Sequence, residues 1–172
     1  MARVWLFGDN VDTDQIVPGR YAPYMTSEKE LRQYPFIEAR PAFAAEVRPG
    51  DIIVAGSNFG CGSSREYAPR ALVAVGIAAI VAPSYARIFF RNALNLGLPL
   101  FEADLTQHLQ DGQQVTLDIA RGTLVAGDET FQLPPPSAWV ARVWRAGGMV
   151  AYYRQHGAFP LEEARPCPTP SA

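Results

Sequence analysis

Residues 51–66, with the sequence DIIVAGSNFGCGSSRE, decide the fold of this chain of 172 residues. The run at 51–55 is almost wholly apolar and is bounded by glycines, which is typical of a strand buried on both faces of a parallel sheet. After the glycine-rich segment, residues 65–75 have the composition of a helix that ends at Gly76. A strand, a glycine loop and a helix in this order predict the start of a parallel βαβ unit.

The same alternation continues along the chain. Residues 77–82 (IAAIVA) predict a second buried strand, because this run is also apolar throughout. Residues 85–96 predict a helix capped by Ser84, and residues 98–101 predict a third strand. The segment from 51 to 101 therefore predicts a parallel βαβαβ core and an α/β fold class.

Further segments flank this predicted core. Residues 113–119 and 123–133 alternate polar and apolar side chains and are expected to form an added antiparallel strand pair. Residues 3–7 indicate another strand, and residues 11–21 indicate a loop because turn-forming residues dominate them. Residues 137–156 predict a helix that two glycines interrupt. The flanking segments thus add strands and helices to the same domain and do not predict a second hydrophobic core.

Composition limits the kind of molecule. Hydrophobic residues make up 48% of the chain, the net charge is -2 and the pI is about 5.7. We therefore expect one globular domain at 1–160, followed by a proline-rich, disordered tail at 161–172, with no affinity for nucleic acid.

No apolar run approaches the ~20 residues of a membrane span, and the first residues lack the apolar core of a signal peptide, so a cytoplasmic location is expected. Two cysteines and two histidines, widely scattered, predict that any metal comes with a partner.

The glycine-rich segment carries the strongest chemical signal. A glycine loop at a helix N-terminus binds anions through its N–H groups, and Ser63, Ser64 and Arg65 stand at this point. The Arg65 guanidinium can hold a carboxylate through two hydrogen bonds. The spacing matches neither the dinucleotide fingerprint GxGxxG nor the nucleophile elbow GxSxG, and the lysine of a P-loop is absent. The residues alone leave two interpretations open, an anion site or a helix start with Ser64 as its N-cap.

Three motifs together resemble the swivelling domain of the aconitase superfamily. Residues 60–66 (GCGSSRE) resemble its GxGSSRE signature, and residues 12–18 (DTDQIVP) resemble the DTDxIxP opening of its stand-alone small subunits. Residues 84–89 (SYARIF) with Asn92 are similar to a third family segment. The motifs occur in the family's order, and the chain has the length of the small subunits of 3-isopropylmalate dehydratase and homoaconitase. The resemblance implies a three-layer β/β/α swivelling domain.

The resemblance also implies a partner and a reaction. In this family a large subunit carries a [4Fe–4S] cluster, so this chain is expected to bind no cofactor itself. The enzyme, a hydro-lyase, removes water from a malate-like acid and adds it back with the hydroxyl on the neighbouring carbon. A base must take a proton from that carbon, and the family's serine base corresponds to Ser63. Half an active site also leaves a surface through which the isolated chain can self-associate.

Further site residues follow from the same resemblance. Ser64 and Arg65 correspond to positions that bind a substrate carboxylate. Asp14 corresponds to an aspartate that pairs with a histidine from the other half of the site, although by itself it indicates only an Asx turn. A serine base needs strong stabilisation of its anion. The groups expected to provide it, besides Arg65, are the backbone N–H groups of Gly60, Cys61 and Gly62.

The side chains of three residues in these segments stay without an assigned role. Arg87 lies in the SYARIF motif, but an exposed helical arginine fits equally well. Arg91 is expected on the same helix and has no role that the sequence supports. The Cys61 side chain is expected to be a small buried thiol, because one cysteine in the loop cannot hold a cluster.

Substrate choice in these small subunits is attributed to the loop after the DTD motif. The outer tyrosines of this loop resemble the isopropylmalate pattern, and the arginine that homoaconitases often carry in the third place is absent. We therefore favour isopropylmalate and leucine biosynthesis. Homoaconitate in lysine biosynthesis via 2-aminoadipate is the alternative, because an arginine next to the loop can still reach a carboxylate. A non-catalytic anion- or nucleotide-binding module is the third hypothesis. The residues expected to contact substrate here are Arg20, Tyr21, Ala22, Pro23 and Tyr24.

Overall fold

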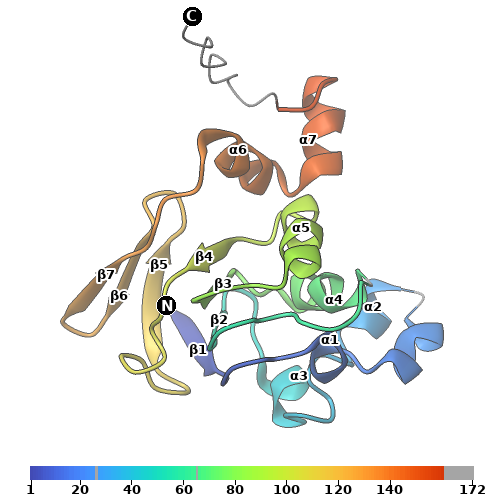
Figure 1. Cartoon of the computed structure of the whole chain (residues 1–172), viewed down its shortest axis with the longest axis horizontal. Helices are drawn as coiled ribbons and strands as arrows, with labels where there is room; N and C mark the ends of the chain where they lie inside the picture. Colours follow the sequence, from blue (N-terminus) through green and yellow to red (C-terminus); the bar gives the residue numbers. More distant parts are fainter. Residues whose placement is uncertain (26, 65, 161–172) are drawn as a thin grey trace, which may run out of the picture.

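The computed structural model of the chain describes residues 1–25, 27–64 and 66–160. At the centre of the described part, a curled sheet of seven strands has the order β4-β3-β2-β1-β5-β6-β7 (Figure 1). Neighbours from β4 to β1 are parallel, and neighbours from β1 to β7 are antiparallel. The strands are β1 (Ala2–Leu6), β2 (Ile52–Val54), β3 (Ala79–Ala82), β4 (Leu100–Glu102), β5 (Gln114–Asp118), β6 (Thr123–Ala126) and β7 (Glu129–Gln132).

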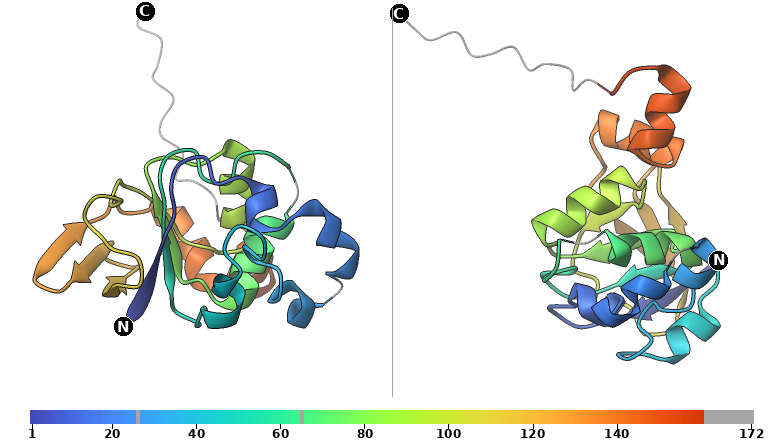
Figure 2. Two further views of the ribbon diagram at one scale, coloured as in Figure 1. Left: turned by 90° about the horizontal axis from the view of Figure 1, so that it is seen from below. Right: turned by 90° about the vertical axis from the view of Figure 1, so that its right-hand side faces the viewer.

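The helices and the curled sheet form three layers. The helices α1 to α5 cover one face of the parallel strands, and β5 to β7 curl across the other face (Figures 1 and 2). The helices α6 and α7 lie at the end of the molecule beside α5. Their bounds, with one 3₁₀ helix η1, are α1 (Thr13–Ile16), η1 (Gly19–Tyr24), α2 (Glu28–Leu31), α3 (Ala42–Glu46), α4 (Tyr67–Val75), α5 (Arg87–Asn95), α6 (Ala138–Ala146) and α7 (Met149–His156).

Burial on both faces explains why the parallel strands are continuously apolar. Successive side chains of a strand point to opposite faces. In β2, Ile53 packs into the core between sheet and helices, whereas Ile52 and Val54 pack into the core between the parallel strands and β5 to β7. In β3, Ile80 and Val81 divide in the same way. The predicted βαβαβ unit and the β/β/α layering are therefore confirmed.

Two helix starts differ from the sequence expectation. Ser84 does not cap α5, whose N-cap is Ala86. The Ser84 hydroxyl instead accepts a hydrogen bond from the Asn58 N–H at 2.8 Å. Ser64 does not cap α4 either, because the N-cap of that helix is Glu66. Both serines are thus committed to the loops that precede the helices.

Two flanking predictions were also incomplete. The segment predicted as a loop at 11–21 contains α1, because the side chains of Asp12 and Gln15 form a capping box with each other's backbone N–H groups. The second half of the predicted strand pair is two strands, β6 and β7, which a turn with Gly127 at φ +60° separates. The helix predicted at 137–156 does break at its glycines. The tail predicted at 161–172 lies outside the described residues.

A buried carboxylate joins β1 to the start of β2. Asp51 is 5% exposed and accepts three hydrogen bonds. The donors are the Arg3 N–H at 3.0 Å, the Trp5 indole N–H at 3.0 Å and the Arg48 N–H at 2.9 Å. Since a buried carboxylate is stable only when its oxygens are hydrogen-bonded, Asp51 fixes where these strands begin to pair.

An ion pair between Arg40 and Asp111 ties the segment before α3 to the segment before β5 and makes stability depend on pH. The Arg40 guanidinium binds the Asp111 carboxylate, which also accepts the Leu6 N–H at 2.9 Å. The hydrogen bond from Arg40 lowers the pKa of Asp111 below its usual value. The folded state therefore gains stability from this carboxylate at neutral pH and loses that gain as the pH falls through the lowered pKa.

We predict that Asp111→Asn destabilises the protein at pH 7 and has little effect in acid. The difference in unfolding free energy from the unaltered chain should be largest above pH ~5 and should shrink steadily below pH ~4. Urea unfolding at a series of pH values measures it. A difference that stays constant from pH 7 to pH 3 would show that the Arg40–Asp111 charge pair contributes nothing.

Candidate active site

Two motifs that lie far apart in the sequence meet at one edge of the sheet. The loop after β1 and the glycine-rich loop after β2 both leave the carboxyl ends of neighbouring parallel strands. The Gly60 N–H donates to the Val11 carbonyl at 2.7 Å, and the Thr13 N–H donates to the Cys61 carbonyl at 2.8 Å. The Ser63 N–H then donates to the Thr13 hydroxyl at 2.9 Å. These three bonds hold the DTD and GSSRE motifs together.

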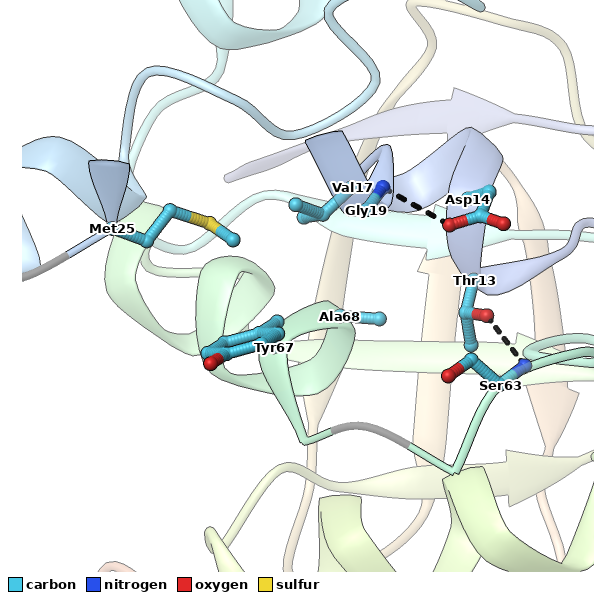
Figure 3. A pocket seen from close by; sticks show the side chains of 8 residues that line it. All are labelled: Thr13, Asp14, Val17, Gly19, Met25, Ser63, Tyr67 and Ala68. Carbon is cyan, nitrogen blue, oxygen red and sulfur yellow. Dashed lines mark hydrogen bonds between the residues drawn. The ribbon is translucent and has the colours of Figure 1, made fainter. Parts of the chain in front are cut away.

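A small pocket opens where the two loops meet (Figure 3). Thr13, Asp14 and Ser63 lie on one side of it. The exposed Asp14 carboxylate accepts a hydrogen bond from the Gly19 N–H at 3.1 Å. Asp14 thus makes the local turn contact expected from its residue type and also lies in the same pocket as Ser63. The structure therefore brings together the two residues predicted to be catalytic.

The other side of the pocket is apolar, and the sequence analysis did not single it out. Val17, Met25 and Ala68 are buried there in the core between sheet and helices, and the half-buried Tyr67 packs against that core. Figure 3 shows the Met25 side chain extending toward the polar side, whereas the Tyr67 ring extends with its hydroxyl away from Ser63. Only their positions in the sequence could have pointed to these residues. Met25 directly follows the predicted selectivity residues, and Tyr67 directly follows the GSSRE motif.

The glycine-rich loop after β2 packs so closely on α5 that only glycine fits at position 60. Gly60 has φ +78°, and a Cβ built on it would lie 2.2 Å from the Phe89 ring. The side-chain amide of Asn92 on the same helix donates to the Ser64 carbonyl at 3.3 Å. The segment resembling the family's third motif therefore supports the loop that carries the serines.

The predicted anion nest is only partly open to a ligand. The Gly60 N–H is already bound to Val11, and the Ser63 N–H is bound to Thr13. Because α4 begins at Tyr67, Ser63 and Ser64 precede its first turn rather than stand in it. The predicted role of Arg65 falls on a residue outside the described part of the chain.

The Cys61 thiol is half-buried beside the serines. Its sulfur lies 3.6 Å from the Asn10 carbonyl, to which it can donate.

In the described residues, no three His, Cys, Asp or Glu side chains gather closely enough to hold a metal ion. None of the described helices has the length and apolar character needed to cross a bilayer.

The five predicted selectivity residues lie in η1, beside the pocket rather than in its lining. Arg20 pairs with the Glu38 carboxylate and lies over the Tyr21 ring at 5.3 Å. Hydrogen bonding with Tyr21, and then the charge of Glu38, raise the pKa of Arg20. Tyr24 is 62% exposed, and Pro23 is exposed as well. Ala22 packs against the core.

Arg87 and Arg91 lie elsewhere on α5. Both are exposed and line a shallow hollow with Tyr85 and Phe90. The Tyr85 hydroxyl lies 2.8 Å from the Ile80 carbonyl and 2.9 Å from the Phe101 carbonyl, and its one proton can be donated to either. Burial raises the pKa of Tyr85, and its hydroxyl ties the segment before α5 to β3 and β4. The two arginines are not among the residues that line the Ser63 pocket.

Comparison with known proteins places the chain among small subunits of hydro-lyases. The family model of the aconitase C-terminal domain matches residues 9–103. The chain is 51% identical over 163 residues to 3-isopropylmalate dehydratase small subunit 1 of Deinococcus radiodurans, covering 95% of this chain and 92% of that protein. It is 52% identical over 163 residues to the homoaconitase small subunit of Thermus thermophilus, covering 94% and 100%. Both activities therefore occur among relatives of nearly equal identity.

A solved structure gives the same result for the fold. The crystal structure of 3-isopropylmalate dehydratase from Methanocaldococcus jannaschii matches with a TM-score of 0.84 at 39% sequence identity. The match covers 91% of this chain and 93% of that chain. The likeness thus extends over nearly the whole length of both proteins.

We predict that Gly60→Ala destabilises the protein much more than Gly127→Ala. Both glycines have positive φ, but an added Cβ meets the Phe89 ring at Gly60 and meets nothing within 4 Å at Gly127. Urea unfolding should show a loss of about 2–4 kcal/mol for Gly60→Ala and about 1–2 kcal/mol for the control. Equal losses would mean that the loop does not depend on its close contact with α5.

Proposed function

The chain belongs to the aconitase C-terminal domain family, and from this premise we propose that it is the small subunit of a hydro-lyase that interconverts 2-isopropylmalate and 3-isopropylmalate. The reaction removes water and adds it back with the hydroxyl on the adjacent carbon. The observation that carries the proposal is the pocket in which Ser63 and Asp14 lie together.

In this proposal, Ser63 is the base that takes the proton from the carbon next to the hydroxyl-bearing carbon. Its backbone N–H is held by Thr13, which fixes the position of the residue at the pocket. A serine alkoxide forms only where positive charge or hydrogen-bond donors stabilise it. We assign that stabilisation to the remaining N–H groups of the loop and to Arg65. Ser64 and Arg65 also hold a carboxylate of the acid.

A large subunit completes the site. Small subunits of this family work with a large subunit, and we propose that the partner of this chain carries the [4Fe–4S] cluster. When bound there, the cluster supplies Lewis acidity toward the leaving hydroxyl. The described residues of this chain do not gather the ligands that a cluster needs. Asp14 lies at the exposed rim of the pocket, where its carboxylate can orient a histidine of the partner subunit.

Homoaconitate is the second candidate substrate. The observation that favours it is the homoaconitase small subunit of Thermus thermophilus, which this chain matches at 52% identity over that protein's whole length. The observations that favour isopropylmalate are the proline at position 23 in place of an arginine, and the pairing of Arg20 with Glu38. We therefore rank isopropylmalate first.

We predict that Ser63→Ala abolishes turnover without preventing assembly. The reconstituted complex with the large subunit should lose at least about a thousandfold in kcat, because the substitution removes the hydroxyl that is proposed to take the proton. Ser57→Ala is the matched control, since Ser57 is an exposed serine of the same glycine-rich segment outside the pocket. Co-purification of both variants with the large subunit checks assembly. Substantial turnover by an assembled Ser63→Ala complex would remove Ser63 as the base.

We predict that the same complex prefers isopropylmalate to homoaconitate. The ratio of the two kcat/KM values should be at least about tenfold, because an apolar substituent matches the uncharged wall and an extra carboxylate does not. Assays of both acids with one enzyme preparation measure the ratio. The opposite ratio would make homoaconitate the substrate, and no turnover of either acid by a cluster-loaded complex would reject the hydro-lyase proposal.

A further inference from the structure

The Thr13 side chain joins the two loops of the candidate site at Ser63 itself. Thr13 is 5% exposed, and its hydroxyl oxygen accepts the Ser63 N–H at 2.9 Å. Figure 3 shows this hydrogen bond on the polar side of the pocket. Because a buried hydroxyl is stable only when it is hydrogen-bonded, the bond is part of how the two loops pack together. One threonine side chain therefore helps to set where the Ser63 backbone lies.

The backbone of Thr13 is held on both sides before its side chain reaches the other loop. The capping box of Asp12 and Gln15 starts α1 at Thr13. The Thr13 N–H donates to the Cys61 carbonyl at 2.8 Å, and the Thr13 carbonyl accepts the Val17 N–H at 2.9 Å. A hydroxyl on a backbone that is already ordered loses little further freedom when it binds a partner. The Thr13 hydroxyl can thus hold its partner in one place.

The residue before Ser63 is a glycine that lets the two loops approach closely. Gly62 has φ +102°, and a Cβ built on it would lie 3.1 Å from the Thr13 hydroxyl oxygen. Such a Cβ would be closer to the oxygen than most Cβ atoms come to any neighbour, and a side chain would also be strained at this φ. Glycine at this position therefore keeps the Thr13 hydroxyl free to bind the Ser63 N–H.

The helix that carries Thr13 also carries the second residue proposed to be catalytic. Asp14 follows Thr13 in α1, and its carboxylate accepts the Gly19 N–H at 3.1 Å. Thr13, Asp14 and Ser63 all line the same pocket. The Thr13 hydroxyl thus links the Ser63 backbone to the helix on which Asp14 lies. In a catalytic site, a displacement of about 1 Å can lower the rate about a hundredfold.

We propose that Thr13 is a positioning residue that holds the Ser63 base through the hydrogen bond between the Ser63 N–H and the Thr13 hydroxyl. The proposal rests on the hydro-lyase function, in which the proton passes from carbon to the Ser63 oxygen. Thr13 takes no proton from the acid in this proposal, and its hydroxyl acts only on the backbone of the base. Loss of the hydroxyl should therefore slow the proton transfer much more than it weakens binding of the acid.

Thr13→Val tests the proposal, because valine keeps the shape of threonine and removes the acceptor of the Ser63 N–H. In the reconstituted complex with isopropylmalate, kcat per assembled complex should fall at least about tenfold, and KM should change less than about threefold. Thr13→Ser keeps the hydroxyl and should restore kcat to within about threefold of the unaltered complex.

Ser84→Ala is the matched control. The Ser84 hydroxyl also accepts an N–H of the glycine-rich segment, that of Asn58 at 2.8 Å, but Ser84 is not among the residues that line the pocket. Its removal should change kcat less than about threefold.

A deuterium isotope effect on kcat separates a misplaced base from a general loss of order. The label stands on the carbon that gives up its proton, so the effect reports on cleavage of that C–H bond. Product release limits many enzymes, and a misplaced base slows the C–H step alone. The isotope effect should therefore be larger for Thr13→Val than for the unaltered complex, whereas partial unfolding would lower kcat and leave the isotope effect unchanged.

Each outcome decides between the proposals. An assembled Thr13→Val complex with unaltered kcat, an unchanged isotope effect or an equal loss from Ser84→Ala would overturn the inference and leave the hydro-lyase function intact. A complex of the unaltered chain that turns over neither isopropylmalate nor homoaconitate would reject the hydro-lyase function and the inference with it. Circular dichroism and co-purification check folding and assembly. If Thr13→Val does not assemble, Thr13→Ala carries the test with the same expected direction.

Discussion

Burial of both faces of the parallel strands is the constraint on which the rest of this structure depends. Strands β1 to β3 place alternate side chains into two separate cores, so one sheet must be covered by helices and by its own continuation. Parallel strands end at the same edge of a sheet, and this brings the loop after β1 to the loop after β2. The pocket at Ser63 forms because the paired strands bring the two loops close together, and hydrogen bonds then join the loops.

The sequence predicted the features that depend on local patterns. Unbroken apolar runs identified β2 and β3, and the glycine at position 76, with φ +87°, ends α4 where its residue type indicates. The helix α1 was missed because a capping box of two side chains stabilises it, whereas turn-forming residues dominate the local composition. The extra turn between β6 and β7 was missed because alternating residues continue on both sides of it.

For the site, motifs predicted which residues meet but not how they are held. Ser63 and Asp14 followed from the resemblance to a family, and the geometry then showed that Thr13 joins their two loops. The expectation that a helix N-terminus would stand at the serines was wrong, since α4 starts at Tyr67 and the serines precede its first turn. Sequence spacing could not place Met25 and Tyr67 beside Ser63, because the pocket that they line forms only when the loops fold together.

The segment from α1 to Met25 is a contiguous stretch between β1 and α2 that contains Asp14, η1 and one side of the apolar wall. Ser63 stands on a different loop and meets this stretch through a backbone N–H and a threonine hydroxyl. The two residues proposed to be catalytic, Asp14 and Ser63, therefore come from separate loops of the chain. A local change in either loop can displace one of them relative to the other, although the sheet that carries both loops stays the same.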